Sequence, residues 1–183
     1  HFVMWGGTHP TYGDLQGWES YFDYVAGRAG DENALQTDQL NVVGNGYGVY
    51  QLELSKTWEK LHIILYVSHP FDDRSGLRLT NHLDNLWGIC LAFQKKTIFI
   101  QNLVVEFFNT KNQSGQIHLV EGEDGNMHGR GRDDYYNHGV YISGATYHQM
   151  AMVSPLFAPV IEEDAISKGF ESTRFTGFHI GAD

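Results

Sequence analysis

The densest group of side chains able to do chemistry lies in one segment, GRGRDDYYN, at residues 129–137. Its charged, amide and phenol side chains are those of Arg130, Arg132, Asp133, Asp134, Tyr135, Tyr136 and Asn137. A smaller group earlier in the chain consists of Asp72, Asp73 and Arg74. Carboxylates, amides and guanidinium groups hold hydroxyls and anions through hydrogen bonds, and a tyrosine ring offers a flat apolar face for stacking on a sugar. The segment therefore suits a non-covalent polar ligand such as an acidic polysaccharide, or an internal salt-bridge network that packs a loop, and the sequence leaves both open.

Signals for covalent chemistry are weak. Glu106 lies among apolar residues, and two carboxylates, such as Glu106 with Asp72 or Asp73, are what a glycosidase needs, but their separation is not fixed by sequence. The chain contains no G-x-S-x-G elbow, P-loop or dinucleotide-binding glycine motif. Its 10 histidines include no H-E-x-x-H pair, and the single Cys90 excludes an internal disulfide. We therefore expect no catalytic residue, no bound metal and no cofactor.

Composition restricts the class of protein. The chain has 183 residues, with 12 basic and 22 acidic side chains and a formal charge of -10. This charge argues against nucleic acid as a partner, because phosphate binding needs a surplus of Lys and Arg. An aromatic content of 14% favours a folded chain over a disordered acidic segment. No apolar run reaches the ~20 residues of a transmembrane helix, and no signal peptide is recognisable. The length fits one domain or part of a larger one, and the start at His1 rather than Met suggests a mature, trimmed or partial chain.

Short stretches rich in β-branched and aromatic residues, separated by Gly, Asn and Asp, predict an all-β fold. The candidate strands are Trp18–Val25, Tyr47–Lys56, Lys60–Ser68, Leu86–Gln94, Thr97–Phe108, Gly139–Gln149 and Thr173–Ala182. Alternation is clearest where Tyr50, Leu52 and Leu54 are interleaved with polar residues, because a period of two puts alternate side chains on opposite faces. One stretch, Ile161–Lys168, could form about two helical turns.

The lengths of the connections give a second signal. Tight turns are expected at Thr57–Glu59 and Lys95–Lys96, and long links at Gly27–Gly46, His69–Asn85 and Asn109–His138. If successive strands are antiparallel, the long links emerge on one side and the tight turns on the other, as in outer-membrane barrels. The long link Met150–Ser172 breaks this rule, since strand parity puts it on the short-turn side. The pattern alone favours a transmembrane barrel segment and a soluble β-sandwich equally.

Five segments, in order along the chain, show a family resemblance. They are NVVGNGYGVYQLEL (Asn41–Leu54), LYVSHPFDDRSGLRLTNHLDNLWGI (Leu65–Ile89), VVEFFNTKNQSG (Val104–Gly115), GRGRDDYYNHGVYISGATYHQMAMVSPLF (Gly129–Phe157) and STRFTGFHIG (Ser172–Gly181). This succession resembles the capsule-assembly Wzi family of outer-membrane proteins, in its Bacteroidetes branch. That branch has a D-N-Y-Y-N-N-G-x-Y segment, from which the chain departs mildly with Asp133-Asp134 before the tyrosines and Asn137-His138 before the glycine.

The resemblance implies an antiparallel transmembrane β-barrel of roughly 18 strands, comparable to porins, of which this chain would supply about seven. Residues 1–183 would then be a single, partial β-barrel domain, the C-terminal part of a longer protein. It implies a place in the outer membrane of a Gram-negative cell, with the long loops extracellular. It also implies a non-enzymatic, lectin-like role in binding, anchoring or helping to assemble capsular polysaccharide. Outer-membrane lipid and other envelope proteins are further expected partners. The polar residues of segment 129–137 and of the loop at 72–74 would then be the polysaccharide contacts.

Two functions of other classes stay open. The barrel could be a structural subunit of a larger cell-envelope complex with no sugar binding of its own. Alternatively, the chain could be a soluble β-sandwich enzyme that acts on polysaccharide, in which case turnover would vanish on Glu106→Gln.

Overall fold

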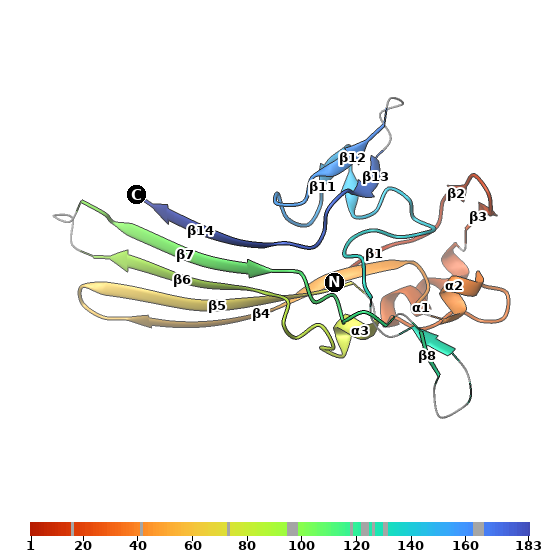
Figure 1. Cartoon of the computed structure of the whole chain (residues 1–183), viewed down its shortest axis with the longest axis horizontal. Coiled ribbons are helices and arrows are strands. Elements are labelled where there is room, and N and C mark those ends of the chain that lie inside the picture. Colours follow the sequence, from red (N-terminus) through yellow and green to blue (C-terminus); the bar gives the residue numbers. More distant parts are fainter. Residues whose placement is uncertain are drawn as a thin grey trace. The chain divides into compact units, whose positions relative to one another are not determined.

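The computed structural model describes residues 1–15, 17–40, 42–72, 74–94, 99–117, 119–121, 125, 127–129, 132–162 and 167–183. The protein is mostly antiparallel β-sheet, with 43% strand and 9% helix, which confirms the all-β prediction. It divides into two compact units (Figure 1). Unit 1 comprises His1–Gly48, Phe71–Asn81 and Gln113–Thr173, and unit 2 comprises Val49–Pro70, His82–Asn112 and Arg174–Asp183.

Unit 2 is an open antiparallel sheet (Figure 1). Its strands, in spatial order, are β4 (Asn45–Thr57), β5 (Leu61–Phe71), β6 (Asn85–Phe93), β7 (Asn102–Asn109) and β14 (Thr176–Ala182). Each corresponds to a strand predicted from the alternation of apolar residues. The predicted tight turn after β4 is confirmed, because the Trp58 amide donates a hydrogen bond of 2.8 Å to the Leu61 carbonyl. The other predicted tight turn, Lys95–Lys96, lies outside the described residues.

One face of the unit 2 sheet is apolar across its strands. Strand pairing places Leu65, Ile89, Val105 and Ile180 in one row, each opposite the next. The neighbouring rows are Ile63, Leu91, Leu103 and Ala182 on one side and Val67, Trp87, Phe107 and Phe178 on the other. Within this unit the face is open, since Leu65, Phe178 and Ile180 are 48%, 79% and 70% exposed. The predicted alternation thus places apolar side chains on one face of the sheet, as in a half-buried sheet. Within the described part of unit 2, however, no other element covers that face.

Strand β4 continues the same rows, with the charged Lys56 among their apolar residues. Two contacts fix its pairing with β5: the Thr57 hydroxyl lies 2.7 Å from Nδ1 of His62, and the ring of Tyr50 stacks on that of His69. Leu54 and Leu52 therefore lie opposite β5 residues of the apolar face. We call the part of this face between Tyr50 and Trp58 of β4 the apolar band. Along β4 the band is eight residues long, or about 27 Å.

The opposite face of unit 2 is polar. Its hydrogen-bonding side chains are those of Gln51, Glu53, Ser55, Thr57, His62, Tyr66, Ser68, Asn102, Glu106 and His179. Apolar residues such as Ile64 and Val104 are interspersed among them. The sheet therefore has two chemically different sides, and neither side encloses a core within unit 2.

Unit 1 contains short elements around a largely aromatic core. They are β1 (Phe2–Met4), β2 (Thr8–His9), β3 (Gly13–Asp14), η1 (Trp18–Ser20), α1 (Tyr21–Ala26), α2 (Gln36–Leu40), α3 (Arg74–Leu77), β8 (Leu119–Glu121), β9 (Met127–Gly129), β10 (Thr146–Tyr147), β11 (Met150–Ala151), β12 (Pro159–Ile161) and β13 (Ser167–Phe170). Its most buried large side chains include Tyr24, Tyr47, Tyr135 and Phe157. β1 pairs with the start of β4, where Phe2 lies opposite Tyr47.

The predicted strand Trp18–Val25 is wrong, because this stretch is helical. Trp18, Tyr21 and Tyr24 are spaced three apart, which places them on one face of a helical turn. All three rings contact Trp5, at centroid distances of 4.6, 6.4 and 5.1 Å. Gly27 then ends the helix in the left-handed conformation, at φ 60°.

Two other predicted elements in unit 1 are also wrong. Gly139–Gln149 is mostly turns, with strand only at Thr146–Tyr147. Positive φ angles at Gly144, His148 and Gln149 prevent an extended strand there. The proposed helix at Ile161–Lys168 is contradicted at both described ends, since Ile161 and Ser167 pair as antiparallel strand residues.

Most of the residues of the predicted long links belong to unit 1. Gly27–Gly46 lies wholly within this unit, and so do Phe71–Asn81 and Gln113–Thr173, which contain most of the other links. The link Met150–Ser172 no longer breaks the parity of the strands, because Gly139–Gln149 adds no strand to the large sheet. Strand β14 pairs directly with β7 instead.

Candidate functional site

The predicted ligand-binding segment lies in unit 1, where residues 132–137 are described. Arg130 and Asp73 lie outside the described residues. Arg74 begins α3, and its side chain is also outside the described part. Arg132 is exposed, with φ 52°.

The two tyrosines of the segment are packed inside unit 1. Tyr135 is 0% exposed and its hydroxyl accepts a hydrogen bond of 2.6 Å from Asn81. Tyr136 is 8% exposed, and its ring lies 5.9 Å from Tyr47 and 5.0 Å from Phe157. Burial raises the pKa of the Tyr136 phenol, and the negative charge of Asp72 raises it further. In this structure neither ring offers an open face for stacking on a sugar.

The two aspartates join three segments that are distant in sequence. Ser114 donates a hydrogen bond of 2.5 Å to the buried Asp133 carboxylate, and the Asp133 amide donates to the Gln113 carbonyl at 3.0 Å. Asp134 accepts a bond of 2.9 Å from the Thr173 hydroxyl. Gln113 closes the network, since its side-chain amide donates to the Thr173 carbonyl at 3.0 Å.

Asp72 and Asn137 bind backbone. The Tyr136 amide donates to the Asp72 carboxylate at 3.2 Å. The side chain of Asn137 makes two bonds with Phe170, accepting from its amide at 2.7 Å and donating to its carbonyl at 3.1 Å. Gly169 lies so close to Asn137 that a Cβ there would overlap the Asn137 amide, so a glycine fits this contact best.

His138, next to the segment, caps a turn. Its Nδ1 atom accepts hydrogen bonds of 3.1 Å from both the Val140 and the Tyr141 amides. Burial lowers the pKa of the His138 imidazole to about 4, and burial also raises the pKa of the nearby Tyr141 phenol. An Nδ1 atom that accepts two N–H groups has no room for its own proton, so the geometry requires a neutral ring.

The predicted polar segment is therefore mainly an internal hydrogen-bond network of unit 1. The bonds join carboxylates, amides and hydroxyls to one another and to backbone, rather than joining arginines to carboxylates among the described residues. Sugar binding by the segment stays a prediction. Arg132 and Asp134 are its described members that are exposed.

A second polar arrangement crosses the sheet of unit 2. Tyr66, Gly88, Glu106 and His179 lie in one row over β5, β6, β7 and β14. The Tyr66 hydroxyl donates to Oε1 of Glu106, and Nδ1 of His179 lies 2.7 Å from Oε2 of the same carboxylate. A Cβ at Gly88 would overlap the Tyr66 ring, so this glycine is what lets the tyrosine reach across β6.

In the sequence, Glu106 stands out as a charged residue among apolar ones, but its partners in this row do not. Glu106 and His179 are 73 residues apart in sequence, and the pairing of β7 with β14 joins them. Their partnership depends on strand register, which the sequence alone does not fix.

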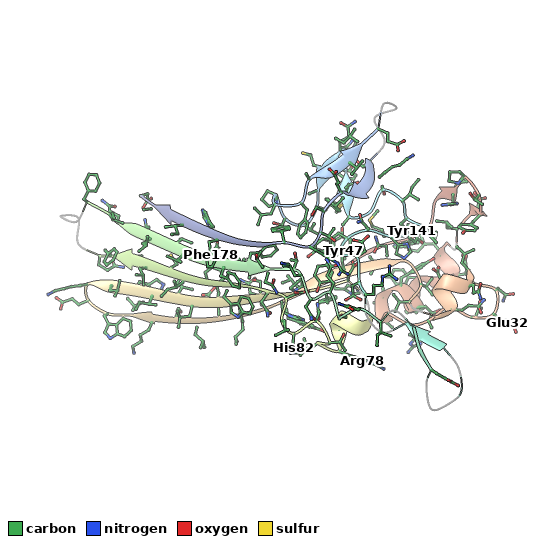
Figure 2. All side chains as sticks on the ribbon, viewed as in Figure 1. Glu32, Tyr47, Arg78, His82, Tyr141 and Phe178 are labelled. Atoms are coloured by element: carbon green, nitrogen blue, oxygen red, sulfur yellow. The ribbon has the colours of Figure 1, made fainter. Side chains whose placement is uncertain are left out.

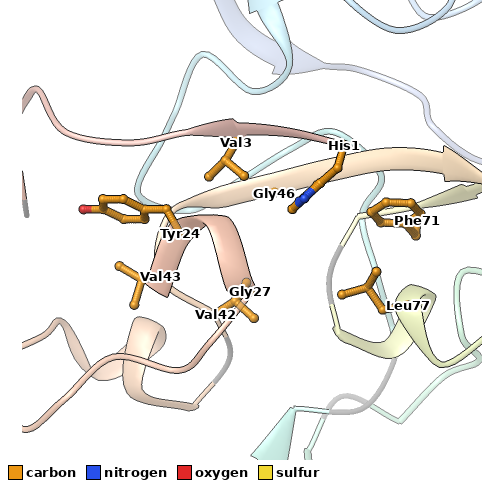
Figure 3. Close-up of a pocket in the computed structure, with 9 residues that line it drawn as sticks. All are labelled: His1, Val3, Tyr24, Gly27, Val42, Val43, Gly46, Phe71 and Leu77. Carbon is orange, nitrogen blue, oxygen red and sulfur yellow. The ribbon is translucent and has the colours of Figure 1, made fainter. Parts of the chain in front are cut away.

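A small cavity in unit 1 is not a ligand site. It is lined mainly by apolar groups, including Val3, Tyr24, Val43, Phe71 and Leu77 (Figure 3). Its volume of about 10 Å³ leaves room for about one water molecule. A sugar ring would not fit.

Three further observations concern cofactors, membranes and relatives. Among the described residues, no group of three or more His, Cys, Asp or Glu side chains is arranged to hold a metal ion. In the same part of the chain, no helix has the length and apolarity to cross a membrane. A scan of protein-family models, a search of curated proteins and a search of solved structures each find no match to this chain.

Proposed function

We propose that the chain is a segment of an outer-membrane β-barrel that binds, anchors or helps to assemble capsular polysaccharide without covalent chemistry. The observation that supports it best is the sheet of unit 2, with one open apolar face and one polar face. A strand that faces lipid on one side and an aqueous lumen on the other has this alternation. The choice of capsular polysaccharide as the ligand rests on the resemblance of five ordered segments to the Wzi family.

The dimensions of the apolar band agree with this proposal. Its length of about 27 Å along the strands becomes about 20 Å in height if the strands tilt by roughly 40°, close to the ~25 Å apolar band of such barrels. Aromatic residues lie near both ends, Trp58 and Phe93 at one and Tyr50 and Trp87 at the other. Aromatic girdles occupy these levels in outer-membrane barrels.

Site-directed spin labelling tests the lipid-facing assignment. Cys90 is the single cysteine, so a Cys90→Ser background allows one label at a time. In lipid vesicles, labels at Leu54 and Ile180 should be relaxed by oxygen, which concentrates in lipid, and not by a water-soluble nickel complex. A matched label at Ser55, next to Leu54 on the polar face, should respond to nickel. Equal nickel accessibility on both faces would contradict the proposal.

Polysaccharide binding in unit 1 needs a separate test. Replacing both Arg130 and Arg132 by Ala should lower capsule retention at the cell surface, because guanidinium groups bind uronates. Arg78→Ala is the matched control, since Arg78 is an exposed arginine of the same unit (Figure 2). If the double variant retains capsule as the control does, these arginines are not the anchor.

A structural barrel subunit is the second candidate function. The burial of Tyr135 and Tyr136 favours it, because these rings stabilise unit 1 instead of facing a ligand. Under this alternative, the protein would co-purify with stoichiometric envelope partners, and the double arginine variant would leave capsule retention unchanged.

A further inference from the structure

We propose that the row Tyr66–Gly88–Glu106–His179 on the polar face of unit 2 is a subsite for a neutral or amino-bearing pyranose sugar. This inference rests on the proposed function and adds to it a site on the sheet, separate from the arginines of segment 129–137. The row is assembled from four strands, so the register of the sheet builds it.

The first component is an aromatic platform. Tyr66 extends from β5 across Gly88, where any larger residue would collide with its ring. One side of the ring is thereby turned to the backbone of β6 and the other away from the sheet. The hydrogen bond from its hydroxyl to Glu106 fixes the ring at its far end. A ring immobilised in this way can stack on the apolar C–H face of a pyranose at little entropic cost.

The second component is a carboxylate with spare acceptor capacity. A carboxylate offers about four lone-pair positions, and the bonds from Tyr66 and His179 use one on each oxygen of Glu106. The Glu106 side chain is 20% exposed, so part of it can be reached by hydroxyl donors. These two bonds also hold the carboxylate in one orientation.

The third component is the imidazole of His179. Its Nδ1 atom faces Glu106 at 2.7 Å, and the side chain is 65% exposed. The Nε2 atom, on the opposite side of the ring, can exchange a hydrogen bond with a sugar hydroxyl. Platform, acceptor and imidazole thus lie side by side along one row.

Charge selects the class of sugar. Glu106 is negative, and Glu53 lies in the same row, since the pairing of Thr57 with His62 places Glu53 opposite Tyr66. A uronate would bring a further carboxylate to this acidic row and be repelled. A neutral or amino sugar meets no such penalty, in contrast to the anionic sugar expected for Arg130 and Arg132.

The test measures binding of three hexasaccharides to the full protein in detergent by isothermal titration calorimetry. The probes are maltohexaose (neutral), a hexamer of glucosamine (amino-bearing) and hexagalacturonate (anionic). We expect the neutral or the amino probe to bind. Tyr66→Ala should weaken that binding about tenfold, equivalent to about 1.4 kcal/mol, whereas Tyr66→Phe, which keeps the ring, should weaken it by no more than about threefold. His62→Ala is the matched control, because His62 lies on the same strand and face but two rows away.

Two results would overturn the subsite: no binding of the neutral or amino probe, or Tyr66→Ala binding as the wild type does. Circular dichroism of each variant establishes that the sheet is intact, and Tyr66→Phe keeps the comparison valid if the alanine variant does not fold. Failure here is distinguishable from failure of the proposed function. If the spin labels place the apolar face in lipid and the arginine variant loses capsule, the proposed function holds. Unchanged sugar binding by Tyr66→Ala would then contradict the subsite alone.

Discussion

Acid should destabilise unit 1 through His138. The folded-state pKa of about 4 lies below the value of about 6.5 for an unfolded histidine. Between these values the unfolded chain binds a proton that the folded chain does not, so stability is complete above about pH 6.5 and falls as the pH decreases toward 4. From pH 7 to pH 4.5 the loss is up to about 2.5 kcal/mol, at 1.36 kcal/mol per pKa unit.

The variant His138→Asn isolates this effect. The Oδ1 atom of Asn occupies nearly the place of Nδ1 and can accept from the same amides of Val140 and Tyr141, yet it does not titrate. Other groups of the chain titrate in both proteins alike, so the informative quantity is the difference between wild type and variant.

Hydrogen exchange read by mass spectrometry provides the assay. Peptides covering Val140 and Tyr141 report the local opening free energy at each pH, after correction for intrinsic exchange rates. We expect wild type to lose up to about 2.5 kcal/mol more protection than His138→Asn between pH 7 and 4.5. Equal losses in the two proteins would refute the assignment of a neutral, doubly accepting imidazole.

Three further predictions follow from packing and from the two faces of the sheet. Tyr136→Ala removes a ring packed against Tyr47 and Phe157 and should lower the unfolding free energy of unit 1 by about 3–5 kcal/mol in denaturant melts; a loss below about 1 kcal/mol would mean that the ring is not part of the core. Gly169→Ala should lower the free energy of unfolding by more than about 1 kcal/mol, because φ is 68° and the new Cβ would meet Asn137. Gly177→Ala is the control and should be nearly neutral, because nothing lies within 4 Å of the new Cβ. Similar melting temperatures for both variants would be evidence against the Asn137 contact. Leu65→Arg should reduce the stability of the protein refolded into vesicles by about 2–4 kcal/mol, and Ser55→Arg on the polar face by less than about 1 kcal/mol; the reverse order would place lipid on the other side.

The sheet of unit 2 could be predicted because its strands alternate with a period of two. That period is a local property, so five strands and the turn at Thr57–Glu59 were visible in the sequence. The helix after Trp18 was missed for the opposite reason. Aromatic residues favour strands on average. Here the rings of Trp18, Tyr21 and Tyr24, spaced three apart, pack against Trp5, which lies outside the segment.

The candidate site shows the same division. The sequence identified the residue types in segment 129–137, and it left open whether they face a ligand or each other. Burial decides this for Tyr135 and Asp133, and burial depends on partners such as Asn81 and Ser114 that come from other segments. The row through Glu106 and His179 could not be found without the register of four strands.

The proposed place of this chain in the outer membrane is tested most directly by fractionation of the native cells. Separating outer membrane from soluble envelope contents on a density gradient should place the protein with the outer membrane, from which only detergent extracts it. Recovery of the protein among the soluble envelope contents would contradict the account.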